Sequence, residues 1–326
     1  MPSAIRIDQL TKDYTLGFWR KRHYRALDQL SLEIADGEVF GFLGPNGAGK
    51  TTTLKLLMQL IFPTGGAAEI LGRPVGDLAT RQRIGYLPEN PQFYDYLTAE
   101  ELLDYFARLF GYGPADRRTR VSTLLDRVGL GAERRLQMRK FSKGMVQRVG
   151  IAQALLNDPE VIFLDEPMSG LDPLGRRDVR QLILELRDQG RTIFFSSHIL
   201  SDAEALCSRV AIVAGGRLAA AGRLNDMLAF EVRGWELVMD GLRPDVLATL
   251  GGVVQRATEI APGRYALELS LDTPPERTLG ELTASGGRLV SLNPLRQSLE
   301  EFFVRRVAEA GRGAREPQAE EAGARR

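Results

Sequence analysis

Short apolar runs alternate with longer helical stretches along the first two thirds of the chain. Three of the runs, at 38–43, 161–164 and 192–195, are almost wholly apolar, as is typical of strands covered on both faces of a sheet. From residue 3 to about residue 224, this alternation predicts an α/β domain with a largely parallel sheet.

A different pattern lies between the first two of these strands. Residues 97–110 repeat apolar positions at helical spacing, and Thr98 with Glu101 gives a capping-box sequence at their start. A second helical stretch follows at 118–128. We therefore expect a helical subdomain, at about 90–158, inserted into the α/β domain.

The last third of the chain changes to the order strand, helix, strand, strand, helix, strand. This order suits a small α+β domain of the ferredoxin-like type, placed at 229–308 after a first domain at 1–228, with a closing helix at 295–308. Residues 309–326 lack apolar periodicity, which predicts a disordered tail. The six segments are 231–239, 244–250, 252–259, 264–271, 275–285 and 288–292.

The net charge and the cysteine content indicate which binding partners and which cellular compartment suit the chain. The 326 residues include 43 Lys and Arg against 42 Asp and Glu, a net charge of +1, so there is no basic surface that would mark nucleic acid as a main partner. The single cysteine, Cys207, excludes an internal disulfide and fits a reducing cytosol. No apolar run approaches the roughly 18 residues that span a bilayer, so a membrane role requires a second protein.

The sequence GPNGAGKT, from Gly44 to Thr51, fits a phosphate-binding loop between a strand and a helix. Its glycines let backbone N–H groups turn toward nucleotide phosphates, and the helix adds the positive end of its dipole. Lys50 is then placed to reach the β- and γ-phosphates, and the Thr51 hydroxyl to bind Mg²⁺. A chance glycine turn would not explain the flanking strand and helix. We call residues 44–51 the phosphate cradle.

Two adjacent carboxylates follow the apolar strand at 161–164. The carboxyl end of a parallel strand lies beside such a cradle at one sheet edge, so Asp165 is expected to hold Mg²⁺ through water. Glu166 is expected to polarise the attacking water. An isolated Asp-Glu pair would more simply be a solvated strand end, and the upstream cradle is what favours the catalytic interpretation.

Four further features accompany the cradle: Tyr14 near the start, FSKGM at 141–145, SGLD at 169–172 and His198 after the next strand. Each alone has a simple structural explanation, such as a helix N-cap or a structural histidine. In this order and spacing they resemble the motifs of the ABC transporter ATPase family, over residues 3–228.

The resemblance implies roles in ATP binding and hydrolysis. Tyr14 would stack on adenine, worth about 1–3 kcal/mol by analogy with base stacking, and His198 would contact the γ-phosphate. Ser142 and Gly144 would meet the γ-phosphate held by a second subunit. The predicted catalytic residues are Glu166, His198 and Glu89; the predicted ATP-binding residues are Tyr14, Gly44, Asn46, Gly47, Gly49, Lys50, Thr51, Thr52, Ser142 and Gly144; and the predicted Mg²⁺ ligands are Thr51, Asp165 and Glu89.

Two motifs depart from the common family pattern. The usual signature is Leu-Ser-Gly-Gly-Gln, and 141–145 keeps only its Ser142 and Gly144. Glu89 stands where the family usually has a glutamine, and a carboxylate there would either bind Mg²⁺ more tightly or position water less well. Both variants, with the closing sequence SLEEFF at 298–303, resemble exporters whose ATPase and permease are separate chains.

An insertion at 15–25 separates Tyr14 from the next strand and contains the basic run Arg20-Lys21-Arg22. A solvated loop is the simpler interpretation. The alternative is contact with the partner or with anionic lipid, where each basic side chain contributes about 1 kcal/mol.

The family resemblance implies a P-loop NTPase that closes as a head-to-tail dimer on ATP, most simply a homodimer. It would drive a separate integral-membrane permease from the cytoplasmic face of the membrane, and the permease would set the cargo. The alternatives are a non-transport ABC ATPase of translation or DNA repair, and a GTP-binding switch, although no Asn-Lys-x-Asp motif follows the cradle. The C-terminal domain is expected to support packing or dimerisation, with a small-ligand sensor as the alternative.

Overall fold

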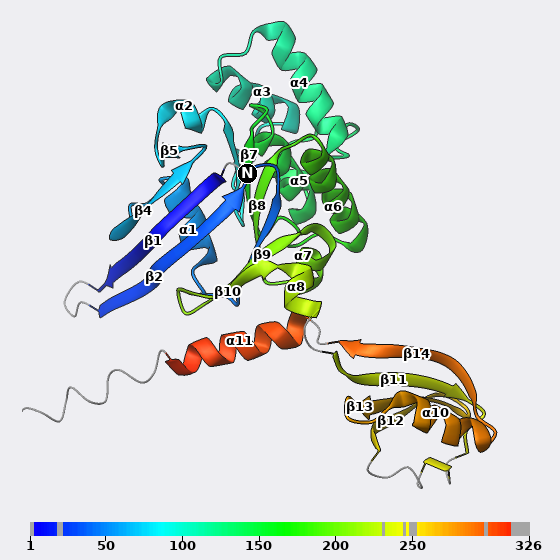
Figure 1. The fold of residues 1–326 in the computed structure, drawn as a ribbon. Helices are drawn as coiled ribbons and strands as arrows, with labels where there is room; N and C mark the ends of the chain where they lie inside the picture. The colour runs from blue at the N-terminus through cyan, green and yellow to red at the C-terminus, as the bar shows by residue number, and fades with distance from the viewer. Residues whose placement is uncertain are drawn as a thin grey trace, which may run out of the picture. The chain divides into compact units, whose positions relative to one another are not determined.

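The computed structural model describes residues 3–17, 22–229, 232–243, 246–247, 253–296 and 299–313. These residues form two compact units (Figure 1). The first contains the described residues up to Leu224 together with those from Phe303 onward, and the second contains Asn225–Phe302. No helix in the described part of the chain is both long and apolar enough to cross a membrane.

A six-stranded sheet forms the centre of the first unit. Its strands lie in the order β10-β9-β3-β8-β7-β6, and all neighbours are parallel except β9 and β10. The largely parallel sheet and its three predicted strands, now β3, β7 and β8, are therefore confirmed. The strands are β3 (Val39–Leu43), β6 (Ile84–Leu87), β7 (Val161–Asp165), β8 (Thr192–Ser197), β9 (Arg209–Ala214) and β10 (Arg217–Arg223).

The first unit also contains an antiparallel sheet, which the apolar pattern of the sequence did not predict. It has the order β2-β1-β4-β5, with β1 and β2 forming a long hairpin. Its pairing depends on residues far apart in the chain, such as Ile5 beside Ile70, which local periodicity does not reveal. The strands are β1 (Ser3–Leu16), β2 (Arg22–Ala35), β4 (Gly65–Ile70) and β5 (Arg73–Pro74).

The hydrophobic core of this unit joins both sheets through the helix α1 (Lys50–Leu57). Residues of β1, β2 and α1 pack with Phe40, Phe163 and Phe194 on one face of the parallel sheet. The ring centroids of Phe40 and Phe163 lie 5.9 and 5.8 Å from that of Phe194. Three adjacent strands are thus tied together by aromatic contacts, and the loops at their carboxyl ends start from fixed positions.

The predicted inserted helices are present between β6 and β7. The first begins with the predicted capping box, because the Thr98 hydroxyl accepts the N–H of Glu101 and the Glu101 side chain accepts the N–H of Thr98. The helices of the first unit are α1, α2 (Leu78–Arg81), α3 (Ala99–Leu109), α4 (Pro114–Arg127), the 3₁₀ turn η1 (Met138–Lys140), α5 (Lys143–Ala154), α6 (Pro173–Asp188) and α7 (Leu200–Leu206), followed by α8 (Leu224–Ala229).

The second unit is a four-stranded antiparallel sheet with the order β12-β13-β11-β14. Placing β13 between β11 and β12 is the arrangement of a split β-α-β unit. Leu237, Leu267 and Leu282 lie in its buried core. Its elements are β11 (Val232–Asp240), β12 (Val254–Ala261), β13 (Arg264–Ser270), α10 (Pro275–Ala284) and β14 (Arg288–Arg296).

The structure corrects two predictions near the C-terminus and describes a third only in part. The helix predicted at 295–308 was placed too early, because Leu295 pairs with Gly234 in the sheet and α11 spans Leu299–Gly313. The start of the predicted disordered tail, 309–313, is therefore helical, whereas 314–326 lies outside the described residues. The predicted helix at 244–250 is described only at 246–247, where it is helical.

Candidate functional site

The phosphate cradle connects β3 to α1 at the carboxyl edge of the parallel sheet. Gly47 and Gly49 have φ values of +79° and +105°, a left-handed conformation that favours glycine. A Cβ atom on Gly49 would lie 2.7 Å from the carbonyl oxygen of Ala26, and one on Gly44 would lie 2.5 Å from that of Val213. The loop therefore needs glycine for its backbone conformation and for its close approach to neighbouring strands.

Lys50, the first residue of α1, is almost fully buried beneath this loop, with 6% of its surface exposed. Its Nζ donates to the carbonyl oxygens of Gly44 at 2.7 Å and Pro45 at 3.3 Å. The same atom lies 3.4 Å from Oε1 of Glu166. A buried ammonium is stable only when paired and hydrogen-bonded, so these groups hold the lysine charge in place.

The two carboxylates after β7 are fixed by a serine from the neighbouring strand β8. Ser196 donates its hydroxyl to Oδ1 of Asp165 at 2.6 Å and accepts the backbone N–H of Glu166 at 3.0 Å. Glu166 has a φ of +52°, which is uncommon for a residue other than glycine and typical of functional sites. The turned backbone directs the Glu166 side chain toward Lys50.

Burial raises the pKa of the Asp165 carboxyl, and hydrogen bonds from Ser196 and Thr51 partly offset this effect. The negative charges of Glu89 and Glu166 raise it further. Oδ2 of Asp165 is buried and has no hydrogen-bond partner among the described residues. A buried carboxylate oxygen without a partner is suited to binding a cation. A bound cation would offset both the desolvation of the carboxylate and its repulsion by Glu89 and Glu166.

The loop after β6 brings Glu89 to the same sheet edge, since β6 is the direct neighbour of β7. Its side chain is exposed but lies near enough to influence the pKa of both Asp165 and Tyr86. For Tyr86, burial is the main cause and the two carboxylates add to it, raising the pKa to about 12. The tyrosine hydroxyl therefore stays protonated at neutral pH.

His198, just beyond β8, reaches Glu166 from the other side. Its Nδ1 lies 2.9 Å from Oε2 of Glu166, and 47% of its side chain is exposed. Glu166 thus lies between Lys50 and His198, each in contact with a different carboxylate oxygen.

The predicted signature residues begin α5, away from these groups. Ser142 is the N-cap, and its hydroxyl accepts the N–H of Met145 at 3.2 Å. With Gly144 it lines a cavity of ≈ 310 Å³ shared with Gly170 and Asp172. Within the described residues, no hydrogen bond or ion pair connects Ser142 or Gly144 to the cradle.

A buried glutamine, which follows the signature sequence on the same helix and belongs to the motif that carries the resemblance, contacts the loop after β7, although it was not among the predicted ATP-binding residues. The side-chain amide of Gln147 donates to the carbonyls of Glu166 at 3.4 Å and Pro167 at 3.3 Å. Gln147 is 1% exposed, so these hydrogen bonds connect α5 to the backbone at Glu166 inside the protein. Ser196 was also not predicted as a site residue, because its hydrogen bond to Asp165 depends on β8 lying beside β7.

The remaining predicted ATP-binding residues lie around the cradle. Asn46 is exposed in the loop, and Thr51 and Thr52 are half-buried in the first turn of α1. Tyr14 lies on β1, opposite Tyr24 of β2. Tyr24 was not predicted, yet its hydroxyl donates to the Gly47 carbonyl at 3.4 Å. Because directly opposed residues share one face of a hairpin, both rings lie on the face that reaches the cradle.

Comparisons with known proteins identify the family to which this chain is similar. Residues 27–169 match the family model described as ABC transporter. An ABC transporter ATP-binding protein of Synechocystis is 46% identical over 93% of this chain and 84% of its own length. A fluoroquinolones export ATP-binding protein of Mycobacterium tuberculosis is 42% identical over 67% of this chain and 70% of its own length. The dimeric ATP-binding cassette MJ0796, in a post-hydrolysis state with ADP and Pi, has a TM-score of 0.63 and 27% identity over 68% of this chain and 98% of its own length.

Proposed function

The chain belongs to the ABC transporter family of ATP-binding proteins, and we propose that two copies close on ATP and Mg²⁺ to drive a permease carried on a separate chain. ATP binding and ATP hydrolysis are its activities as a member of this family. The observation that carries the proposal is the convergence of Lys50, Asp165, Glu166 and His198 at one sheet edge. The signature residues Ser142 and Gly144 remain outside that group.

The donor set at this edge fits Mg²⁺. Thr51 and Asp165 supply a hydroxyl and a carboxylate with an unpartnered buried oxygen, and Glu89 adds a second carboxylate within electrostatic reach. Mg²⁺ is usually held by one or two carboxylates together with substrate phosphates and water. When bound, it would neutralise charge on the β- and γ-phosphates.

The chemistry of this chain's own residues follows from their contacts. In a nucleotide complex, Lys50 would exchange its contact with Glu166 for phosphate oxygens, since its ammonium already lies under the loop. Glu166 would then be free to accept a proton from the attacking water. His198, whose Nδ1 lies beside the other carboxylate oxygen, would contact the γ-phosphate. The buried surroundings of Glu166 and Lys50 strengthen these electrostatic interactions.

The placement of the signature supports a site shared between two copies. The cavity lined by Ser142, Gly144 and Asp172 opens at the N-terminus of α5, where backbone N–H groups favour an anion. The cradle also supports this proposal, because no hydrogen bond or ion pair joins it to the signature of the same chain among the described residues. In a head-to-tail dimer, each signature would complete the γ-phosphate contacts of the other cradle.

Mixing two inactive variants tests this shared site. Ser142→Asp keeps a good N-cap residue on α5 but places a carboxylate against the γ-phosphate, and Lys50→Ala disables the cradle. Each alone is expected to lack ATPase activity. A 1:1 mixture is expected to recover about a quarter of the wild-type rate, because half of randomly paired dimers hold one intact site out of two. ATP hydrolysis is measured by phosphate release.

Ser142→Thr is the matched control, because it retains both the cap and the hydroxyl. It is expected to keep most of the wild-type rate. If the 1:1 mixture stays inactive while both variants remain folded by circular dichroism, the shared site is wrong. If Ser142→Asp alone is fully active, the signature assignment is wrong.

An aromatic groove beside the helical subdomain is the proposed docking site of the permease. A cavity of ≈ 480 Å³ lies among Tyr94, Tyr96, Leu97 and Tyr105, and Tyr94, Tyr96 and Tyr105 are 52%, 62% and 42% exposed. Exposed aromatic clusters of this kind mark interaction sites. The groove follows the loop of Glu89 and includes α3, so it is placed to pass movement from the ATP site to a partner.

Removing one of these rings should weaken the complex without affecting chemistry. Tyr96→Ala is expected to reduce permease affinity by about tenfold or more, since truncating an interface aromatic commonly costs over 1 kcal/mol. The measurement is the amount of its own permease that co-purifies from detergent-solubilised membranes. Leu109→Ala, on the same helical subdomain and 67% exposed, is the control and should not change it. Equal loss with both variants would contradict the groove.

We further propose export as the direction of transport and the cytoplasmic face of the membrane as the location. Export is supported by the sequence identity between this chain and the fluoroquinolones export protein of M. tuberculosis. A peripheral position bound to the permease is supported by membership of the family. A role in translation or DNA repair is disfavoured, because the similar proteins are named as transporter subunits.

A further inference from the structure

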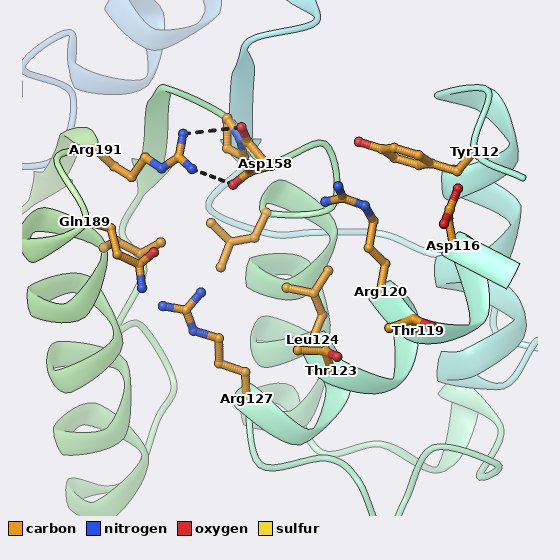
Figure 2. Close-up of a pocket in the computed structure, with 13 residues that line it drawn as sticks. Tyr112, Asp116, Thr119, Arg120, Thr123, Leu124, Arg127, Asp158, Gln189 and Arg191 are labelled. Atoms are coloured by element: carbon orange, nitrogen blue, oxygen red, sulfur yellow. Dashed lines mark hydrogen bonds and ion pairs between the residues drawn. The ribbon is translucent and has the colours of Figure 1, made fainter.

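A second cavity lies at the opposite edge of the parallel sheet from the ATP site. It measures ≈ 600 Å³ and is bounded by α4 on one side and by the segments that precede β7 and β8 on the other. This volume is within the usual range for small-molecule sites. Figure 2 shows Arg120 and Arg127 extending from α4, with Arg191 and Gln189 on the facing side.

Arg120 is held in place by two contacts, and among the described residues most of its N–H donors have no other partner. Its guanidinium lies over the ring of Tyr112, 4.4 Å from the centroid, and one nitrogen donates to the Leu156 carbonyl at a long 3.4 Å. A guanidinium fixed by stacking loses little freedom when it binds an anion. The remaining N–H groups are available to a ligand in the cavity.

Arg127 is the less satisfied of the two arginines on α4. Within the described residues its recorded polar contact is with Oε2 of Glu185, at 3.6 Å, which is longer than a hydrogen bond. Only 26% of its side chain is exposed. A partly buried guanidinium with unused donors is a suitable partner for a carboxylate or phosphate, which it binds through two parallel hydrogen bonds.

The third arginine is already neutralised. Arg191 binds Oδ1 of Asp158 at 2.6 Å and the Asp158 carbonyl at 3.5 Å, the two dashed contacts in Figure 2. Of the charged lining residues, this leaves Arg120 and Arg127 against Asp116 alone. The exposed Gln189 and Thr123 add neutral polar groups. Asp116 and the nearby Glu185 offset part of the charge of Arg120 and Arg127, so the two guanidinium groups, rather than a net charge, are what the α4 side offers to an anion.

The lining also has an apolar part. Leu124, Leu155 and Leu186 line the cavity and are each buried, with 7%, 5% and 5% exposed. A bare inorganic anion would leave this surface unused. Ligand sites usually combine such apolar walls with a few placed polar groups that fix orientation.

We propose that this cavity binds a small organic oxyanion, a phosphate or carboxylate attached to an apolar group. The oxyanion is held by Arg120 and Arg127, and the apolar group lies against the three leucines. The site spans the helical subdomain and the parallel sheet, because α4 belongs to the former and Asp158 and Gln189 precede β7 and β8. It is distinct from the cradle, which lies at the carboxyl ends of the same strands.

A simpler explanation exists for Arg127, which is in the last turn of α4, where a cation interacts favourably with the helix dipole. That explanation does not extend to Arg120, which lies in the middle of the helix, nor to the cavity and its apolar wall. The two accounts differ in whether an added ligand binds.

Calorimetric titration of phenyl phosphate and of benzoate tests the proposal. The full chain is first saturated with Mg²⁺ and a non-hydrolysable ATP analogue, so that the γ-phosphate position of the cradle is filled and cannot take the probe. We expect saturable binding of at least one probe with a Kd of about 1 mM or tighter, and the stronger probe distinguishes phosphate from carboxylate. Benzyl alcohol, which has no charge, should bind at least about tenfold more weakly.

Arg127→Gln is expected to weaken binding of the stronger probe by about tenfold or more. Arg118→Gln removes the same charge from the same helix but does not line the cavity, and should leave the Kd unchanged. Thr123→Glu keeps both arginines and should also abolish binding, by adding a competing carboxylate. All three variants should retain wild-type ATPase activity, so a failure here is distinct from a failure of the ATPase assignment.

Either of two results would overturn the proposal. One is the absence of saturable binding by both probes to the wild-type chain. The other is probe binding that survives Arg127→Gln and Thr123→Glu unchanged, which would place the anion elsewhere on the protein.

Discussion

Replacing Glu166 with glutamine is expected to leave ATP binding intact and to lower the rate of ATP hydrolysis by about 10²–10⁴-fold. The amide keeps the size of the carboxyl group but cannot accept a proton from water. ATP affinity should be equal or higher, because Lys50 no longer has to break its 3.4 Å contact with a charged Glu166 before it binds phosphate. Single-turnover phosphate release and a calorimetric ATP titration measure the two effects.

Glu204→Gln is the control for this variant. Glu204 is exposed on α7, close in sequence to His198, and its loss should change neither rate nor affinity. The Glu166→Gln protein should also accumulate as an ATP-bound dimer in light scattering, since closure no longer ends in hydrolysis. Turnover at the wild-type rate would refute the role of Glu166 as general base.

Lys50→Ala is expected to abolish measurable ATP binding. Removing one partner of a buried, hydrogen-bonded charge pair costs about 2–5 kcal/mol, or about 30-fold to several thousand-fold in affinity. The lysine is nearly buried beneath the cradle and is held there by the Gly44 and Pro45 carbonyls. A calorimetric titration with ATP, with and without Mg²⁺, measures the loss.

Lys55→Ala provides the matched control. It removes the same charge from the same helix, α1, at an exposed position in its last turn. ATP affinity should stay within about twofold of wild type, because an exposed charge at that distance is largely screened by salt. Normal ATP affinity in Lys50→Ala would count against the cradle itself, and with it the ATP site.

Local sequence was sufficient for the features that depend on neighbouring residues. Gly47 and Gly49 of the cradle adopt positive φ values that favour glycine. Because glycine is the residue that permits this conformation, the glycines in the sequence already indicate a tight loop. The capping box at Thr98 is satisfied within four residues. The apolar runs of β3, β7 and β8 are covered on both faces, as their composition predicts.

The sequence therefore determined that the chain has an α/β domain, a phosphate cradle and two carboxylates after a buried strand. Only the tertiary structure decided which of these groups meet. Strand order places β8 between β3 and β7, and this alone brings Ser196 to Asp165 and sets Glu166 between Lys50 and His198. Those contacts join residues more than 30 positions apart in most cases, and periodicity along the chain carries no information about which strands become neighbours. The antiparallel sheet and the arginine cavity depend on packing in the same way.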